Sequence, residues 1–153
     1  MRRILFITAM VTAVVCLVAP AGAAPPEHFS SVTKNIAVTI PPLDQCPTNG
    51  ATSIDLVFSE QFHNVFTDST FHFTNTQTGT FTVRGGGGEA LASGHFVNTV
   101  HDQGPGFPTE AFTSVINAVG KASDGSLTSV HILNHFTVTP TGVVASEFEQ
   151  VSC

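Results

Sequence analysis

The sequence predicts an all-β domain, and three observations support this fold class. After the first two dozen residues the chain is rich in Thr, Val, Phe and Gly and poor in Leu, Lys, Arg and Met, a composition that favours strands over helices. Apolar and polar residues alternate in short runs, and turn signals separate these runs at close spacing. We therefore expect eight or nine short antiparallel strands, arranged as a single β-barrel or a curled β-sandwich.

The alternating runs define the expected strands in chain order. The first extends from Val32 to Ile40 and ends at Pro41-Pro42, because proline cannot donate a hydrogen bond to a strand ladder. Further strands are expected within residues 54–58, 62–66, 71–74, 81–84, 95–101, 112–119, 130–138 and 144–149. Turns are expected at Asn49-Gly50, Asp68-Ser69, Gly85–Gly88, Ser123–Ser126 and Pro140–Gly142. Asn75–Gly79 is interpreted as a hairpin loop, and Asp102–Pro108 as the longest loop.

The N-terminal residues have the three parts of a secretory signal peptide. Arg2 and Arg3 precede an apolar run of 16 residues, Ile4–Ala19, and the small residues Ala21–Ala24 follow. A retained membrane anchor is the less favoured alternative, because a membrane span needs about 20 apolar residues. We expect a signal peptide over residues 1–23, helical over residues 3–20, and a secreted all-β domain over residues 24–153.

The expected mature domain is acidic. The full chain has a formal charge of −6, and loss of Arg2 and Arg3 leaves three basic residues against eleven carboxylates, a formal charge of −8. Nucleic acids and anionic membranes are bound through clustered Lys and Arg. We therefore expect no nucleic-acid partner, and no membrane partner once the signal peptide is removed.

Cys46 and Cys153 are the two cysteines of the expected mature domain, because Cys16 lies in the signal peptide. A cysteine pair in an exported chain predicts a disulfide. In the chain-entropy account, a cross-link that closes a loop near 100 residues stabilises a fold by about 4–5 kcal/mol. Two free thiols or an intermolecular bridge are the alternative interpretation.

The seven histidines suggest a metal site, but their spacing argues against a simple one. His131 and His135 are four residues apart, which on a strand separates them by roughly 13 Å, too far for two ligands of one ion. A site that joins His72, His95 and His135 from separate strands is the remaining metal hypothesis. We favour half-exposed histidines on the polar faces of strands, and no metal.

A ligand or contact surface is the remaining role for these histidines. In a closed barrel, a polar face of Thr, Asn and His would line a ligand-binding interior. The loop around Gly104–Pro108 would present Phe107 to a partner, since such loops often carry binding. The candidate surface residues are His72, His95, His131, His135 and Phe107.

No motif in the sequence predicts a catalytic residue or a cofactor. The run Gly85–Gly88 lacks the Gly-Lys-Ser/Thr ending of a phosphate-binding loop and precedes Glu89. No Gly-x-Ser-x-Gly nucleophile motif is present. Two carboxylate pairs are expected on solvent-facing strand surfaces: Asp55 with Glu60, and Glu147 with Glu149.

The sequence therefore predicts a secreted, non-enzymatic binding or interaction domain. Its partner would be an unidentified small molecule or an extracellular protein, contacted through one barrel end or the loop over residues 102–110. The alternative is a barrel-type isomerase or cyclase that positions a small hydrophobic substrate, an interpretation by analogy of fold alone. A purely structural surface protein is the third interpretation.

Three short segments also point to a family. They are the start of the mature domain, Pro25–Phe29, the mid-chain segment Thr74–Gly79, and the late Cys153. With the signal peptide, they resemble a loose group of small exported actinobacterial proteins of unknown function, over most of the mature chain. The resemblance implies a one-domain β structure, and it carries over no catalytic residue.

Overall fold

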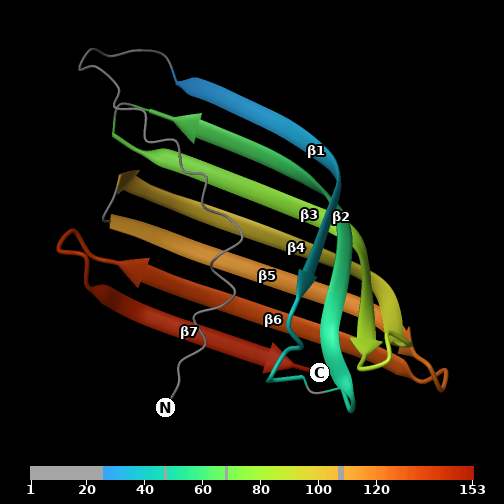
Figure 1. The fold of residues 1–153 in the computed structure, drawn as a ribbon. Coiled ribbons are helices and arrows are strands. Elements are labelled where there is room, and N and C mark those ends of the chain that lie inside the picture. The colour runs from blue at the N-terminus through green and yellow to red at the C-terminus, as the bar shows by residue number, and fades with distance from the viewer. Residues whose placement is uncertain (1–25, 47, 68, 107–108) are drawn as a thin grey trace.

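The structure, a computed structural model, describes residues 26–46, 48–67, 69–106 and 109–153. These residues form one antiparallel sheet of seven strands in the order β1-β2-β3-β4-β5-β6-β7, each paired with the next along the chain (Figure 1). The strands are β1 (Glu27–Ile40), β2 (Ala51–Phe66), β3 (Phe71–Gly85), β4 (Ala90–Gly106), β5 (Thr109–Ala122), β6 (Leu127–Val138) and β7 (Val144–Ser152).

The predicted all-β, antiparallel fold is confirmed, but the predicted strand number and closure are wrong. The described residues form seven strands rather than eight or nine, and they belong to one curled sheet rather than two layers. The sheet is not closed into a barrel, since β1 and β7 remain its two edges. The expected signal-peptide helix over residues 3–20 and the side chain of Phe107 lie outside the described residues. None of the described segments is a helix with the length and hydropathy needed to span a bilayer.

Four of the predicted turns connect the strands where the sequence places them. They contain Gly50, Gly88, Gly125 and Gly142, whose φ angles lie between 76° and 86°. This left-handed region is freely open to glycine and costly for other residues, which explains why the chain has glycine at each turn.

Two predicted loops are instead strand. Asn75–Gly79 lies inside β3 and pairs with β2 through the partners Phe62 and Phe58 at its ends. Its polar side chains resemble a turn in the sequence, but Asn75 and Gln77 make hydrogen bonds on one face of the sheet. The start of the predicted loop at residues 102–108 likewise extends β4 as far as Gly106.

Close approach of neighbouring backbones at glycines accompanies the strong curl of the sheet. A Cβ at Gly79 would overlap the carbonyl oxygen of Val57, and a Cβ at Gly94 would overlap that of Val119. Glycine in a strand interior commonly marks such a bend. In β1, the pairing shifts between Thr33 and Ile36, and the second half of the strand crosses in front of the sheet (Figure 1).

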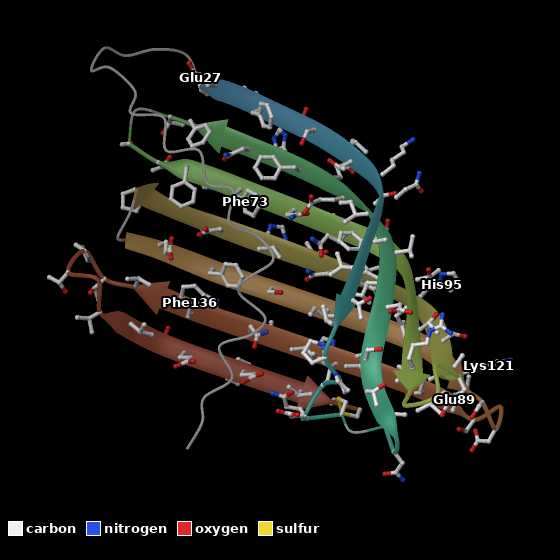
Figure 2. The ribbon with its side chains drawn as sticks, viewed as in Figure 1. Glu27, Phe73, Glu89, His95, Lys121 and Phe136 are labelled. Carbon is white, nitrogen blue, oxygen red and sulfur yellow. A yellow bond between two sulfur atoms is a disulfide. The ribbon has the colours of Figure 1, made fainter. Side chains whose placement is uncertain are left out.

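The curl gives the sheet a concave and a convex face, and the core lies on the concave one. Phe73 and Phe136 point to the side toward which β1 bends, which we call the concave face (Figure 2). The paired registers of the six ladders assign alternate residues to each face. The buried side chains of the described residues belong to the concave face: Phe58, Asn75, Gln77, Val83, Ala92, Phe96, Val100, Ser114 and Ile132.

The predicted Cys46–Cys153 disulfide is present. It joins the loop after β1 to the residue that follows β7, and Cys153 Sγ also lies 3.3 Å from the carbonyl oxygen of Gln45. The bond therefore ties the two edge strands together at one end of the curl, which we call the disulfide-linked end. Apolar rows such as Val38–Leu56–Phe81 occupy the concave face there.

Candidate functional site

A chain of hydrogen-bonded polar side chains crosses the middle of the concave face. Glu60 Oε1 accepts hydrogen bonds from Asn75 Nδ2 and, at 3.1 Å, from Gln77 Nε2. Gln77 Oε1 accepts from Asn98 Nδ2 at 3.1 Å, and Asn98 Oδ1 accepts from Ser114 Oγ at 3.2 Å. We call these five residues, contributed by β2, β3, β4 and β5, the polar band. Every pair joins neighbouring strands, so the band is fixed by strand register.

Phenylalanines cover the concave face on the side of the polar band away from the disulfide-linked end. Phe62 packs edge-on against Phe73 at 4.7 Å between ring centroids. Phe112 stacks on Phe136 at 4.9 Å with an interplanar angle of 18°. All four side chains are only half-buried, and Figure 2 shows Phe73 and Phe136 projecting from this face. We call these four rings the aromatic cluster, and it meets the polar band where Phe62 pairs with Asn75.

Three buried oxygen atoms beside the polar band have no hydrogen-bond partner among the described residues. They are Asn64 Oδ1, Asn75 Oδ1 and Asp102 Oδ1. Asn75 is only 1% exposed, and the ladder places Asn64 and Asp102 on either side of Phe73 in one row. An unpaired buried polar atom costs about 1–3 kcal/mol. The three oxygens are therefore unsatisfied within the described residues, and neighbouring atoms cover each of them.

Asp102 has a perturbed acidity. Burial raises the pKa of this carboxyl from 3.8 to about 6, and repulsion by the Glu110 carboxylate adds to the increase. A hydrogen bond from the backbone of Gln103 acts in the opposite direction. Such an acid exchanges a proton close to neutral pH, which is a property of functional carboxyls as well as of structural ones.

The predicted histidines lie on the other, convex face and do not converge. His131 Nδ1 lies 2.7 Å from Asn117 Oδ1, and His135 Nδ1 lies 2.8 Å from Thr113 Oγ1. His72 and His95 are exposed and border separate hollows. In the part of the chain that the structure describes, no three His, Cys, Asp or Glu side chains gather as metal ligands.

The two hollows are broad and shallow. One, of about 500 Å³, lies around Gly79 and is bordered by His95, Val57 and Val97. The other, of about 460 Å³, is bordered by His72, Pro105 and Glu110 near the far end of the sheet.

Of the two predicted carboxylate pairs, Asp55 with Glu60 is divided between the two faces. Asp55 lies on the convex face as expected, in an ion pair with Arg84 at 2.9 Å. Hydrogen bonds from Arg84 and then Thr39 hold its pKa below its usual range. Glu60 instead faces the concave side in the polar band, because it pairs in register with Gln77. Glu147 and Glu149 are exposed, yet they share the concave face through their partners in β6.

Sequence reasoning missed the polar band because Asn75 and Gln77 were interpreted as turn residues and Glu60 as a surface charge. Their spacing carried a signal: Asn75 and Gln77 continue the alternation that Phe71 and Phe73 begin, so all four share one face. Comparison with known proteins finds no family model, no curated protein and no solved structure that matches this chain.

Proposed function

We propose that this chain is an exported, non-enzymatic binding domain, and that its concave face binds a small molecule with an apolar body and a polar head. The observation that carries the proposal is the group of half-buried aromatic rings beside the polar side chains of the concave face. Half-buried rings of the aromatic cluster offer the apolar contact, and the half-buried side chains of Asn64 and Asp102 offer the polar contact. Binding sites commonly combine an apolar lining with a few placed polar groups.

Export is supported by the leader-like first 23 residues and by the disulfide. The Cys46–Cys153 bond fits an extracellular protein, since disulfides persist in oxidising compartments. Removal of a leader would leave a domain with its cross-link intact, because both cysteines follow residue 24. The resemblance to small exported actinobacterial proteins is in keeping with the same location.

The absence of Trp and Tyr from the sequence allows a direct test of where a ligand binds. Phe136→Trp places a sole fluorophore in the aromatic cluster. Phe148→Trp places one on the convex face, where Phe148 is 50% exposed and pairs with His135. Titration with decanol, an apolar molecule with a small polar head, should shift the emission of the first variant to the blue and leave the second unchanged. Equal responses, or none in the first, would contradict the proposal.

Native mass spectrometry of the exported protein provides the complementary measurement. A retained small molecule, lost on Phe73→Ser but kept in Phe148→Trp, would identify the natural ligand at this face. Retention by all variants would locate the ligand elsewhere.

An isomerase or cyclase acting on a small hydrophobic substrate is the second candidate. The observation in its favour is Asp102, whose pKa of about 6 suits proton transfer. Incubating the retained molecule with the protein in heavy water tests this candidate, because proton transfer at carbon introduces deuterium. Deuterium uptake that Asp102→Asn abolishes would support catalysis, whereas no uptake would leave binding alone.

A further inference from the structure

The last strand of the sheet, β7, has an outer edge that no described strand covers. Among the described strands β6 is its only partner, and the pairing between them is regular from Ser146 to Ser152. A strand edge of this kind presents a row of unpaired backbone N–H and C=O groups. Eight of the nine residues of β7 are exposed, so a further strand has access to these groups.

The opposite edge of the sheet, β1, is interrupted. Its pairing shifts between Thr33 and Ile36, a segment that contains Lys34 and Asn35, and Asn35 has a φ of 58°. Proteins commonly protect an edge from further pairing with such an irregularity and with lysine. β7 contains neither proline nor lysine, and its pairing shift lies before Ser146. Of the two edges, β7 is therefore the one that is open to a new strand.

The two faces of β7 have different side chains at the centre of the strand. Glu147 and Glu149 belong to the concave face, whereas Phe148 belongs to the convex face and is 50% exposed. Among the described residues, neither glutamate has an ion-pair partner. A strand paired with this edge would place two residues opposite the glutamates, and the residue between them opposite Phe148.

A second copy of β7 is disfavoured at this edge. In two-fold antiparallel pairing centred on Phe148, Glu147 of one copy would face Glu149 of the other. Pairing centred on either glutamate would place two identical carboxylates opposite each other. Like charges directly opposite one another destabilise paired strands, and such repulsion selects against unwanted partners. The charge of this edge therefore favours a basic strand from a different protein.

We propose that β7 is a docking edge for an extended segment of an extracellular protein, in which two basic residues flank an apolar one. The segment adds a strand antiparallel to β7, and its main chain forms hydrogen bonds with the open edge. Its basic side chains face Glu147 and Glu149, and its apolar side chain covers the exposed ring of Phe148. This inference goes beyond the proposed function, because the edge would bind such a segment whether or not the concave face binds a small molecule.

Two rhodamine-labelled peptides test the inference in fluorescence polarisation titrations of the exported protein at neutral pH. One is Thr-Val-Lys-Val-Lys-Val-Thr, and the other has glutamate in place of both lysines. Because cross-strand pairs of opposite charge are favourable and those of like charge are not, we expect the lysine peptide to bind at least about threefold more tightly. Equal binding of the two peptides, tighter binding of the glutamate peptide, or no binding of either would overturn the inference.

Reversing the charge of the edge should reverse the preference. In Glu147→Lys with Glu149→Lys, the glutamate peptide should bind more tightly than the lysine peptide, again by about threefold. Self-pairing of β7 stays disfavoured in this variant, since like charges still face each other, and binding of the glutamate peptide shows that the variant is folded. The matched control is Glu27→Lys with Glu89→Lys, which changes the net charge equally at the start of β1 and in the β3–β4 turn. This control should keep the original preference.

Two outcomes of the charge reversal would overturn the inference. Reversal in both variants would show that net charge alone decides which peptide binds. The original preference in both variants would show that the peptide does not lie on β7.

Two N-methylated forms of the lysine peptide test whether main-chain pairing holds the segment. One form is methylated at its lysines and the other at its valines. Alternate residues of a strand turn their N–H groups toward a given neighbour, so at least one form should bind about tenfold more weakly than the unmodified peptide. Undiminished binding of both forms would overturn strand addition, since charge alone would then hold the peptide.

Discussion

Asn75 of β3 donates a side-chain hydrogen bond to Glu60 of β2 in the middle of the concave face. The two residues are not direct partners in the ladder, since Glu60 pairs with Gln77 and Asn75 pairs with Phe62. The bond therefore runs diagonally and joins two rows of side chains. Because Gln77 donates to the same oxygen, one carboxylate satisfies two amides of the polar band.

Replacement of Glu60 should destabilise the fold in proportion to the hydrogen bonds that are lost. Glu60→Ala leaves the amides of Asn75 and Gln77 without an acceptor, and we expect a loss of about 1–3 kcal/mol in the free energy of unfolding. Glu60→Gln keeps one carbonyl oxygen and should cost less. Urea unfolding followed by circular dichroism measures both. Glu147→Ala, an exposed carboxylate of the same face, is the control and should have little effect.

Removal of the disulfide should destabilise the protein strongly. Cys46 and Cys153 are separated by 107 residues, and in the chain-entropy account a loop of that size contributes about 4–5 kcal/mol. The paired substitution Cys46→Ser with Cys153→Ser should lower the free energy of unfolding by that amount in urea titrations. A loss below about 1 kcal/mol would show that the β1–β2 loop stays against the end of β7 without the bond.

The sequence was sufficient to predict the class of fold, four of the turns and the cross-link. Alternation assigned Ile54, Leu56 and Phe58 to one buried face, and the ladders confirm it. Turn glycines such as Gly125 and Gly142 were recognisable because their backbone conformation excludes most other residues. These are local properties, and each can be inferred from a few neighbouring residues.

The closure of the sheet and the polar band were not predictable in this way. Asn75–Gly79 has the composition of a turn, but Asn75 and Gln77 donate hydrogen bonds to Glu60 of the neighbouring strand, and the segment continues the strand. Whether seven strands meet as a barrel depends on cumulative twist and stagger rather than on any single residue. Periodicity identifies which residues share a face, whereas pairing between strands determines what that face contains.

Gly79 should be intolerant of a side chain. A Cβ at this position would overlap the carbonyl oxygen of Val57 and the backbone of Phe58, so the strands would have to separate. We expect Gly79→Ala to lower the free energy of unfolding by about 1–3 kcal/mol, as overpacking does elsewhere. Gly86→Ala is the matched control, because its nearest neighbour, Thr52 Cγ2, is 3.8 Å away. Similar unfolding midpoints for the two variants would contradict the assigned role of Gly79 in the curl.

Asp102 should make stability depend on pH in the acidic range. Its pKa is about 6 in the folded protein, because burial and then the Glu110 carboxylate disfavour the charged form, and near 3.9 in the unfolded chain. The folded state therefore holds the proton more tightly. Proton binding by Asp102 therefore contributes to the free energy of unfolding. This contribution is complete below about pH 4 and is lost as the pH rises through 6.

Asp102→Asn cannot ionise and should keep that contribution at all pH values. A shift of two pKa units corresponds to about 3 kcal/mol, but Asp102 is only half-buried, and solvent screening reduces the expected effect to about 1–2 kcal/mol. Urea unfolding of both proteins between pH 4 and 7 should show equal stability at the acidic end and a more stable variant at neutral pH. In a Glu110→Gln background, the stability difference that Asp102→Asn makes at neutral pH should be smaller, because the carboxylate that repels Asp102 is gone. If the wild-type and Asp102→Asn proteins differ in free energy of unfolding by the same amount at every pH between 4 and 7, ionisation of Asp102 does not affect folding.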